Sequence, residues 1–527
     1  MSSDSTASSA SAGTPATSST PAQQIAAGYQ VSGQALELGT VVVDGKTDPA
    51  AQIRIPLSTV NRHGLVAGAT GTGKTKTLQV IAEQLSAAGV PVLMADVKGD
   101  LSGLSRPGES NDKISERAKE TGDSWEASAF PVDFLSLGTK GIGVPVRATI
   151  ASFGPILLSK VLGLNATQES TLGLIFHWAD QHEPKLPLLD LKDLREVISY
   201  LTGDQGKTEL KTLGGVSAQT AGVILRALVN LEAEGADTFF GEPELKPKDL
   251  LRFNDKGHGV ISLLELGDQA ARPVLFSTFL MWVLSDLFKS LPEIGDVDKP
   301  KLVFFFDEAH LLFTDASKAF LEQVEQTVKL IRSRGVGVFF CTQLPTDVPN
   351  EVLSQLGARI QHALRAFTPD DQKALTKTVR TYPKTDVYDL ASALTSLGIG
   401  EAVVTVLSER GAPTPVAWTR LRSPRSLMAA IGDDAIATAA KSSPLGATYG
   451  QTVDSKSAYE ILKEIEARAA ANQPAEAGSK NAPAVEKKPG WFKRFVNSRG
   501  FQTFLKALGT ELIRGMFGGN RRRRQGR

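Results

Sequence analysis

The sequence of 527 residues has few of the side chains that build metal centres or covalent frameworks. Its single cysteine, Cys341, excludes a disulfide scaffold, and its six histidines show no metal-ligand spacing, so we predict no zinc site. A lone cysteine fits a reducing compartment, and we expect the protein to be cytoplasmic. No run of about 18 uncharged apolar residues occurs, which argues against membrane-spanning helices.

The composition is otherwise that of a globular protein, with 41% hydrophobic and 22% charged residues. The net charge of +1 hides an asymmetry, because residues 487–527 hold 12 of the 58 Lys and Arg but only one of the 57 Asp and Glu. The other residues therefore carry 46 basic and 56 acidic side chains. A basic end on a mildly acidic body indicates a polyanionic partner for that end.

Strand-like and helix-like runs alternate from about residue 61, which predicts an α/β fold with a mainly parallel sheet. A mostly helical stretch interrupts the alternation and is interpreted as an insert. The first residues are almost all Ser, Ala, Thr, Pro and Gln, and we expect a disordered leader there rather than a secretory signal. The expected segments are the leader 1–25, a short β segment 26–60, two parts of the core 61–150 and 258–425, the insert 151–257, a helical segment 426–467, a linker 468–489 and a basic amphipathic tail 490–527.

A glycine-rich motif lies between a strand-like and a helix-like run. Residues 68–75 read Gly68-Ala69-Thr70-Gly71-Thr72-Gly73-Lys74-Thr75, which matches G-x-x-x-x-G-K-[ST] in full. Glycines let successive backbone N–H groups turn inward around phosphate oxygens, and the following helix adds partial positive charge at its N-terminus. Lys74 would lie between the terminal phosphates, Thr75 would ligate Mg²⁺, and Lys76 extends the binding segment. The motif therefore predicts a nucleoside triphosphate site.

Two acids follow the most apolar strand-like run, Leu302 to Phe306. In doubly wound sheets the carboxyl ends of the strands border the ligand crevice. We predict that Asp307 holds Mg²⁺ through water and that Glu308 orients and polarises the attacking water. The alternative is an ordinary helix start, where acids suit the helix dipole. Beside an intact phosphate loop, the second acid favours a hydrolase.

Another strand-like run, 335–341, ends in Thr342 and Gln343. Gln343 either helps to place the water or sense the terminal phosphate, or simply ends a strand. Arg332 and Arg334 close the helical run before this strand. They are either cations suited to a helix C-terminus or arginine fingers offered to a neighbouring subunit's nucleotide.

Arg359 and Arg365 are rival candidates for the arginine finger. Asp96 and Lys98 follow the strand-like run 90–95, whose end we expect near the phosphate loop. Asp96 is interpreted either as a carboxylate behind the metal ligands or as part of a plain turn. Lys98 is interpreted either as a contact for nucleotide or DNA or as part of that same turn.

These motifs together resemble the HerA/FtsK superfamily, and most of all the bacterial YjgR-type HerA-like helicase proteins, over roughly residues 26–450. The resemblance is carried by the loop at 68–75, the turn at 96–100, the segments 307–310 and 341–343, and the further segments 163–169 and 258–263. It implies a RecA-like core that hydrolyses ATP, often in a hexameric ring that moves DNA. In such rings an arginine of one protomer completes its neighbour's site.

HerA resembles this chain in its motor but has a β-barrel domain before its phosphate loop, which docks a partner nuclease. Residues 26–60 are too short for that barrel, so we do not expect the nuclease partnership.

Three functions remain open. The first is a nucleic-acid-stimulated ATPase that translocates DNA, with basic residues binding phosphates. The second is a motor that moves polypeptide or that docks at a membrane. Its basis is the segment 501–517, whose apolar residues are spaced as in a basic amphipathic helix. Such a helix would either lie on anionic lipid or pack against another protomer. The third is a regulatory ATP-binding module, against which the intact Lys74 and Glu308 argue.

Overall fold

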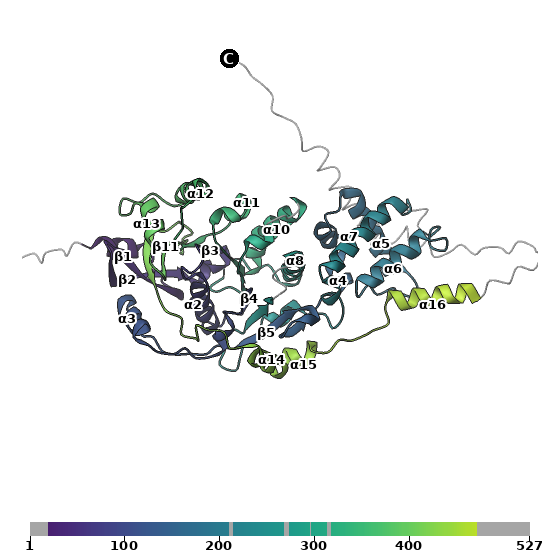
Figure 1. Ribbon diagram of the computed structural model, residues 1–527, viewed down its shortest axis with the longest axis horizontal. Helices are drawn as coiled ribbons and strands as arrows, with labels where there is room; N and C mark the ends of the chain where they lie inside the picture. The colour runs from purple at the N-terminus through teal and green to yellow at the C-terminus, as the bar shows by residue number, and fades with distance from the viewer. Residues whose placement is uncertain (1–18, 210–213, 268–272, 296, 314–317, 472–527) are drawn as a thin grey trace, which may run out of the picture. The chain divides into compact units, whose positions relative to one another are not determined.

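A mixed β-sheet organises the first of two units, Met1–Glu466, in the computed structural model, which describes residues 19–209, 214–267, 273–295, 297–313 and 318–471. Its twelve strands lie in the order β2-β1-β12-β11-β10-β3-β9-β8-β4-β7-β5-β6. The strands from β10 to β6 run parallel, and the other four extend the sheet in antiparallel pairs (Figure 1). This confirms the mainly parallel α/β fold. The strands are β1 Ala35–Val43, β2 Lys46–Pro56, β3 Gly64–Ala67, β4 Val92–Asp96, β5 Val132–Leu137, β6 Val144–Val146, β7 Ile261–Glu265, β8 Leu302–Phe306, β9 Val336–Thr342, β10 Ala358–Gln361, β11 Glu401–Thr405 and β12 Ala417–Leu421.

Helices cover both faces of the sheet, as the apolar faces of a parallel sheet require. One face packs against α2, and the other packs against α8 and α10. The helices are α1 Pro21–Ala27, α2 Lys74–Ala87, α3 Asp112–Thr121, α4 Ile150–Val161, α5 Ala166–Gln181, α6 Leu191–Thr202, α7 Ala218–Ala233, α8 Pro273–Ser290, α9 His310–Phe313, α10 Lys318–Ile331, α11 Asn350–Leu353, α12 Pro369–Val379, α13 Leu390–Ser396, α14 Asp433–Ser442, α15 Pro444–Tyr449 and α16 Ala458–Ala471.

The strand β8 contributes to both cores because its side chains alternate in direction. Phe304 and Phe306 join the core beneath α8 and α10, and their ring centroids lie 4.2 Å apart. Val303 and Phe305 join the core beneath α2. Asp307 has the same parity as Val303 and Phe305, so the strand directs it toward the side of the sheet on which α2 begins.

The helices α4 to α7 form a helical insert that shares its core with the sheet. Phe239, which follows α7, has its ring centroid 6.1 Å from that of Phe279 and 6.3 Å from that of Trp282, both on α8. Within the insert, the Asn165 side chain accepts a hydrogen bond from the Gln168 backbone and starts α5 with a capping box. The insert is therefore packed into the core and does not hang from the sheet on linkers.

The expected leader 1–25 is wrong in its last residues, because α1 begins at Pro21. The Thr20 side chain accepts a hydrogen bond from the Gln23 backbone at 3.2 Å, and Gln23 returns a bond to the Thr20 backbone. This capping box starts the helix, and the burial of Ile25 holds it on the protein. Residues 1–18 lie outside the described residues.

The expected linker 468–489 also starts too early, because α16 continues to Ala471. The run Ala469-Ala470-Ala471 explains this difference, since alanine has the highest helix propensity. The rest of the linker and the tail 490–527, with its expected helix 501–517, lie outside the described residues. Within the described ranges, none of the helices is both long and apolar enough to cross a bilayer.

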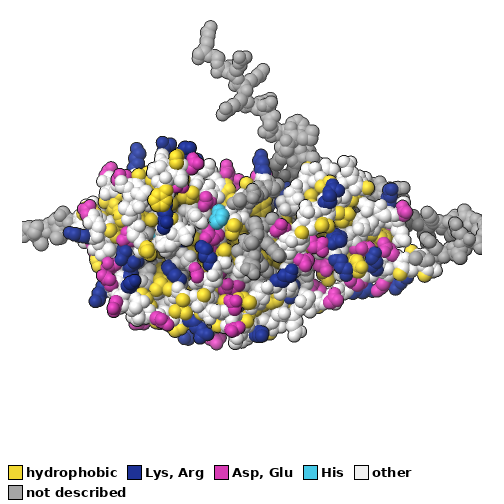
Figure 2. Space-filling model, in the orientation of Figure 1, with side chains coloured by type: hydrophobic (Ala, Val, Ile, Leu, Met, Phe, Trp, Pro, Cys, Tyr) yellow, Lys and Arg dark blue, Asp and Glu magenta, His cyan; other side chains and the backbone are white. Residues whose placement is uncertain are grey.

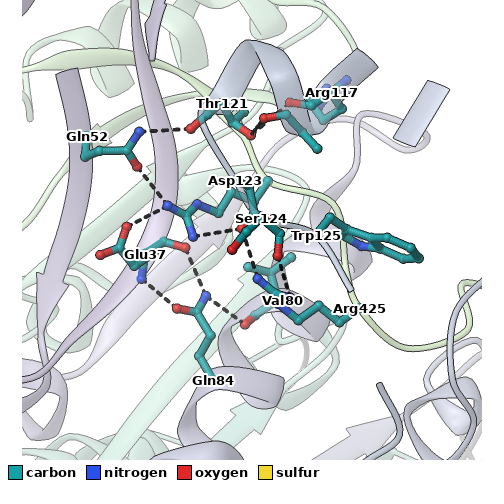
Figure 3. A network of polar contacts seen from close by, with 12 residues as sticks. Glu37, Gln52, Val80, Gln84, Arg117, Thr121, Asp123, Ser124, Trp125 and Arg425 are labelled. Atoms are coloured by element: carbon teal, nitrogen blue, oxygen red, sulfur yellow. Dashed lines mark hydrogen bonds and ion pairs between the residues drawn. The ribbon is translucent and has the colours of Figure 1, made fainter. Parts of the chain in front are cut away.

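A polar network fastens the β1–β2 edge of the sheet to α2 and to the chain beyond β12 (Figure 3). Glu37 of β1 accepts a bond of 2.6 Å from Arg422, and its carbonyl accepts one of 2.9 Å from the Gln84 side chain of α2. Asp123, just after α3, accepts from Arg422 at 3.3 Å and from Arg425 at 2.9 Å. Segments from both ends of the unit therefore meet at one cluster.

Candidate active site

The loop 68–73 joins β3 to α2 and is shaped by its glycines. Gly68, Gly71 and Gly73 have φ angles of 151°, 81° and 110°, which glycine adopts without strain. A Cβ added at Gly68 would lie 2.5 Å from the Cβ of His362, so only glycine fits beside the end of β10. A Cβ added at Gly71 would meet nothing within 4 Å, and Gly71 is exposed, so the loop is open at this residue. This open cradle of backbone fits phosphate oxygens.

Neighbouring loops hold the phosphate loop from outside. The Ala69 N–H donates to the Ala363 carbonyl at 2.8 Å, and the Gly400 N–H donates to the Thr72 carbonyl at 3.1 Å. Beneath the loop, the Thr77 hydroxyl and His362 Nε2 share a hydrogen bond of 2.9 Å. Burial lowers the pKa of His362 to about 4, so its ring is neutral at physiological pH.

The two lysines at the start of α2 point in different directions. Lys74 is buried and its Nζ donates to the carbonyls of Gly68 at 2.7 Å and Ala69 at 3.3 Å, so the ammonium lies inside the loop. Thr75 is half-buried in the first turn of α2. Lys76 turns away, and its Nζ donates to the Met428 carbonyl at 2.9 Å. The loop therefore holds one lysine ammonium against its backbone at the N-terminus of α2, an arrangement that suits a triphosphate.

The strand β9 links this loop to the acids that follow β8. The Gly68 N–H donates to the Thr342 carbonyl at 3.2 Å, and the Ala309 N–H donates to the Cys341 carbonyl at 2.7 Å. The two carbonyls belong to consecutive residues and point to opposite sides of β9. Adjacent strands lie about 4.8 Å apart, so the loop and the acids are separated by roughly 10 Å at the same edge of the sheet.

The two acids after β8 have different surroundings. Asp307 is buried, and burial with the nearby charge of Glu308 raises its pKa. Glu308 has a φ of 49°, a left-handed conformation that is uncommon outside glycine, and its N–H donates to Asp307 Oδ1 at 3.0 Å. Its two carboxylate oxygens lie 2.8 Å from Lys98 Nζ and 3.4 Å from His310 Nδ1. Both acids are therefore held by specific contacts.

Further acids lie at the ends of β4 and β7. Asp96 accepts hydrogen bonds from three backbone N–H groups of the turn 98–101, and burial raises its pKa to about 6. Burial, together with the charges of Asp96 and Asp433, raises the pKa of Glu265 to about 8. The sheet order puts β9 and β8 between β4 and the loop strand, so Asp96 is a neighbour of the acids and not of the loop itself.

Magnesium fits the residues at this edge. Among the described side chains, no group of three or more His, Cys, Asp and Glu is arranged to hold a metal alone. Mg²⁺ does not require such a group, because it commonly takes one or two protein oxygens and completes its shell with water and substrate phosphates. The Thr75 hydroxyl and the Asp307 carboxylate are oxygens of this kind.

The other predicted residues divide between the two edges of the sheet. Gln343 is exposed at the end of β9, between the loop and the acids. Arg365 is exposed two residues beyond Ala363, on the loop side. Arg332 and Arg334 instead precede β9, at the edge where the parallel strands begin. Within one chain the arginines before β9 do not meet the phosphate loop.

Arg334 and Arg359 are engaged within their own chain. Arg334 Nη1 donates to the Leu291 carbonyl at 2.8 Å, and its guanidinium lies 4.9 Å from the ring centroid of Phe288. Arg359 Nη1 donates to the Thr381 carbonyl at 3.2 Å. Sequence reasoning did not find the contacts of Lys98 with Glu308 and of His362 with Thr77, because each joins segments that only the strand order brings together.

Comparisons with known proteins agree with this site. The family described as Helicase HerA-like C-terminal matches residues 42–514. The DNA double-strand break repair helicase HerA of Saccharolobus solfataricus is 22% identical over 398 residues, which are 75% of this chain and 70% of that protein. The Probable helicase MJECL08 of Methanocaldococcus jannaschii is 31% identical over 153 residues, 28% of this chain and 27% of that protein.

Solved structures also align with this chain. The bacterial conjugative coupling protein TrwB is 16% identical with a TM-score of 0.49, over 77% of this chain and 94% of that one. VirB4 of Thermoanaerobacter pseudethanolicus is 14% identical with a TM-score of 0.45, over 75% of this chain and 98% of that one. The family match is the stronger finding, because it includes the phosphate loop, both acids and the insert between them. The chain therefore belongs to the HerA-like helicase family and is a P-loop ATPase.

Proposed function

We propose that this ATPase uses Mg²⁺ and ATP to translocate DNA as a ring oligomer. In this proposal the loop amides and Lys74 bind the phosphates, while Thr75 and Asp307 hold the metal. Glu308 then polarises the attacking water, and Gln343 lies where it can help to orient that water. When bound, Mg²⁺ neutralises the charge that develops on the phosphates.

The observation that carries the proposal is the pair of hydrogen bonds to β9. They fasten the start of the phosphate loop and the turn after Asp307 to consecutive carbonyls, those of Thr342 and Cys341. Phosphoryl transfer depends mainly on positioning and charge neutralisation, so a fixed spacing between phosphate binder and carboxylates is the chief requirement.

A cavity at the opposite edge of the sheet supports assembly with other copies of the chain. It has a volume of about 660 Å³ and is lined by four basic side chains, Arg62, Lys329, Arg332 and Arg359. Among the described residues that line it, none is acidic. We propose that Arg332, which is exposed there, acts on the nucleotide of a neighbouring copy, with six copies as the family resemblance implies.

DNA is proposed as the substrate because relatives are named as helicases, one of them for DNA double-strand break repair. The excess of basic residues in 487–527 also suits a polyanion. On the face of the molecule in Figure 2, Lys and Arg are interspersed with Asp and Glu, so no broad basic patch forms there. On this face, contacts of the described residues with DNA would therefore depend on individual cations.

The test is ATP turnover at low salt with magnesium or with EDTA, in the presence of duplex DNA, single-stranded DNA, RNA or anionic lipid vesicles. We expect turnover to require magnesium and to rise with DNA. Mass measurement with and without nucleotide should detect the ring, and Arg332→Ala should abolish turnover while retaining ATP binding. Turnover that responds to vesicles but to no nucleic acid would replace the DNA motor with a membrane-associated one.

Arg380→Ala provides a matched control, since Arg380, like Arg332, is an exposed arginine, and it lies at the end of α12. It should leave both turnover and mass unchanged. A monomer that hydrolyses ATP at full rate would rule out the proposed role of Arg332.

A further inference from the structure

The carboxylate proposed to polarise water is paired with a lysine. Lys98 Nζ lies 2.8 Å from Glu308 Oε1, and the lysine side chain is 47% exposed whereas that of Glu308 is 10% exposed. The pair therefore extends from a buried acid to a cation in contact with solvent. A carboxylate oxygen that accepts a bond from an ammonium is less available to accept one from water.

Hydrogen bonds hold the backbone around Lys98, whereas its side chain is partly exposed and can change direction. Asp96 accepts bonds from the N–H groups of Lys98 at 3.1 Å, Gly99 at 2.8 Å and Leu101 at 2.8 Å, which fixes the turn after β4. The four-carbon stem of lysine allows the ammonium to point either at Glu308 or outward. A partly exposed ion pair is also weak, because solvent screens it, so a competing anion can break it.

Lys98 differs in this respect from Lys74, whose ammonium is enclosed by the phosphate loop. The strand β4 is separated from the loop strand β3 by β8 and β9. An anion that approaches Lys98 from solvent therefore need not enter the phosphate loop. The backbone of a nucleic acid supplies such anions, because its phosphates keep their charge while they remain hydrated.

We infer that the ion pair of Lys98 with Glu308, here called the latch, keeps Glu308 inactive, and that a phosphate of bound nucleic acid breaks this pair. Without nucleic acid, Lys98 holds the Glu308 carboxylate and turnover is slow. When a backbone phosphate takes the Lys98 ammonium, Glu308 is free to polarise water. This inference rests on the proposed function and adds to it a physical link between substrate binding and hydrolysis.

The experiment compares ATP turnover of the full chain and of Lys98→Met with and without duplex DNA. We expect the variant to turn over ATP about two- to fivefold faster than the wild type without DNA, as loss of a weak ion pair allows. Its stimulation by DNA should fall toward one. The slope of log DNA affinity against log salt should also decrease in magnitude by about one.

Lys160→Met is the matched control, because it breaks an ion pair of the same 2.8 Å length, with Glu169 in the helical insert. It should change neither rate. Lys98→Arg should retain the pair and the low rate without DNA, and Lys98→Gln repeats the test should the methionine variant be unstable.

Other results would overturn the inference. A parallel fall of both rates in Lys98→Met would make Lys98 only a support for Glu308. A loss of preference for ATP over ADP with normal DNA stimulation would make it a ligand of the terminal phosphate. If the wild type is not stimulated by DNA, the proposed function itself fails. If it is stimulated and Lys98→Met is stimulated equally, only the latch fails.

Discussion

The two halves of the proposed site are held together by different forces. The phosphate-loop half is held by backbone hydrogen bonds to Ala363 and Gly400 and by the neutral ring of His362. The carboxylate half is a cluster of buried acids, and Lys98 pairs with one of them, Glu308. The first half is therefore set by geometry, whereas the second responds to protons, cations and competing anions.

The largest expected effect separates binding from hydrolysis in the carboxylate half. Glu308→Gln should lower ATP turnover by about 10²–10⁴, because an amide cannot polarise water as a carboxylate does. ATP binding, which belongs to the other half, should be retained. Single-turnover hydrolysis and fluorescent-ATP binding measure the two quantities.

Glu351→Gln at an exposed position of α11 is the control and should change neither quantity. Normal hydrolysis by Glu308→Gln would remove Glu308 from the proposal.

The next largest effect is expected from a change in the phosphate-loop half. Gly68→Ala would bring a Cβ to 2.5 Å from His362 Cβ at a φ of 151°, so the loop and β10 must separate. We expect ATP affinity to fall at least about tenfold and the free energy of unfolding to fall by about 1–3 kcal/mol. Gly45→Ala, at a φ of 72° with nothing within 4 Å, should lose about 1 kcal/mol of stability and no ATP affinity. Equal ATP affinity in both variants would mean that the contact with His362 is unimportant.

The third effect concerns protons in the carboxylate half. Because the pKa of Glu265 is raised from 4.5 to about 8, the folded state binds this proton more tightly than the unfolded state. The contribution to stability is present below pH 4.5 and is lost as the pH rises toward 8. Glu265→Gln should remove this loss of stability between pH 4.5 and 8. The measurement is the free energy of unfolding in urea at several pH values across this range. If this free energy depends on pH as steeply in the variant as in the wild type, the raised pKa of Glu265 is not the cause.

The smallest effect has the opposite sign and belongs to the loop half. The pKa of His362 is lowered from 6.5 to about 4, so the unfolded state takes up the proton first as the pH falls. His362 should therefore destabilise the fold as the pH falls from 6.5 toward 4. In the same experiment, the free energy of unfolding of His362→Asn should fall less steeply between pH 6.5 and 4 than that of the wild type. An equally steep fall in the variant would mean that other groups cause the loss of stability in acid.

Local patterns in the sequence predict the phosphate loop and the acids. The loop is defined by eight consecutive residues, and Asp307 and Glu308 directly follow an apolar run. The contact of Lys98 with Glu308 could not be predicted, because it depends on β4 lying next to β8. The place of His362 depends in the same way on β10 lying next to β3. Such strand orders arise from competition among whole-sheet packings, which no single motif encodes.

The end of the expected leader was misjudged for a different reason. Its composition is typical of disorder, but Thr20 and Gln23 form a capping box, and Ile25 is buried. The four residues from Thr20 to Gln23 therefore start a helix within a segment whose overall composition indicates disorder.

The network in Figure 3 has a consequence for synthesis of the chain. Glu37 contacts Arg422 across 385 residues of sequence, and β1 pairs with β12 over a similar separation. During translation the hairpin of β1 and β2 therefore lacks its neighbour β12. The free edge of β1 stays uncovered until almost the whole unit has left the ribosome. Such distant pairings slow folding and leave an exposed strand edge open to aggregation during translation. Chains truncated before Arg422 should consequently depend on chaperones far more than the complete unit does.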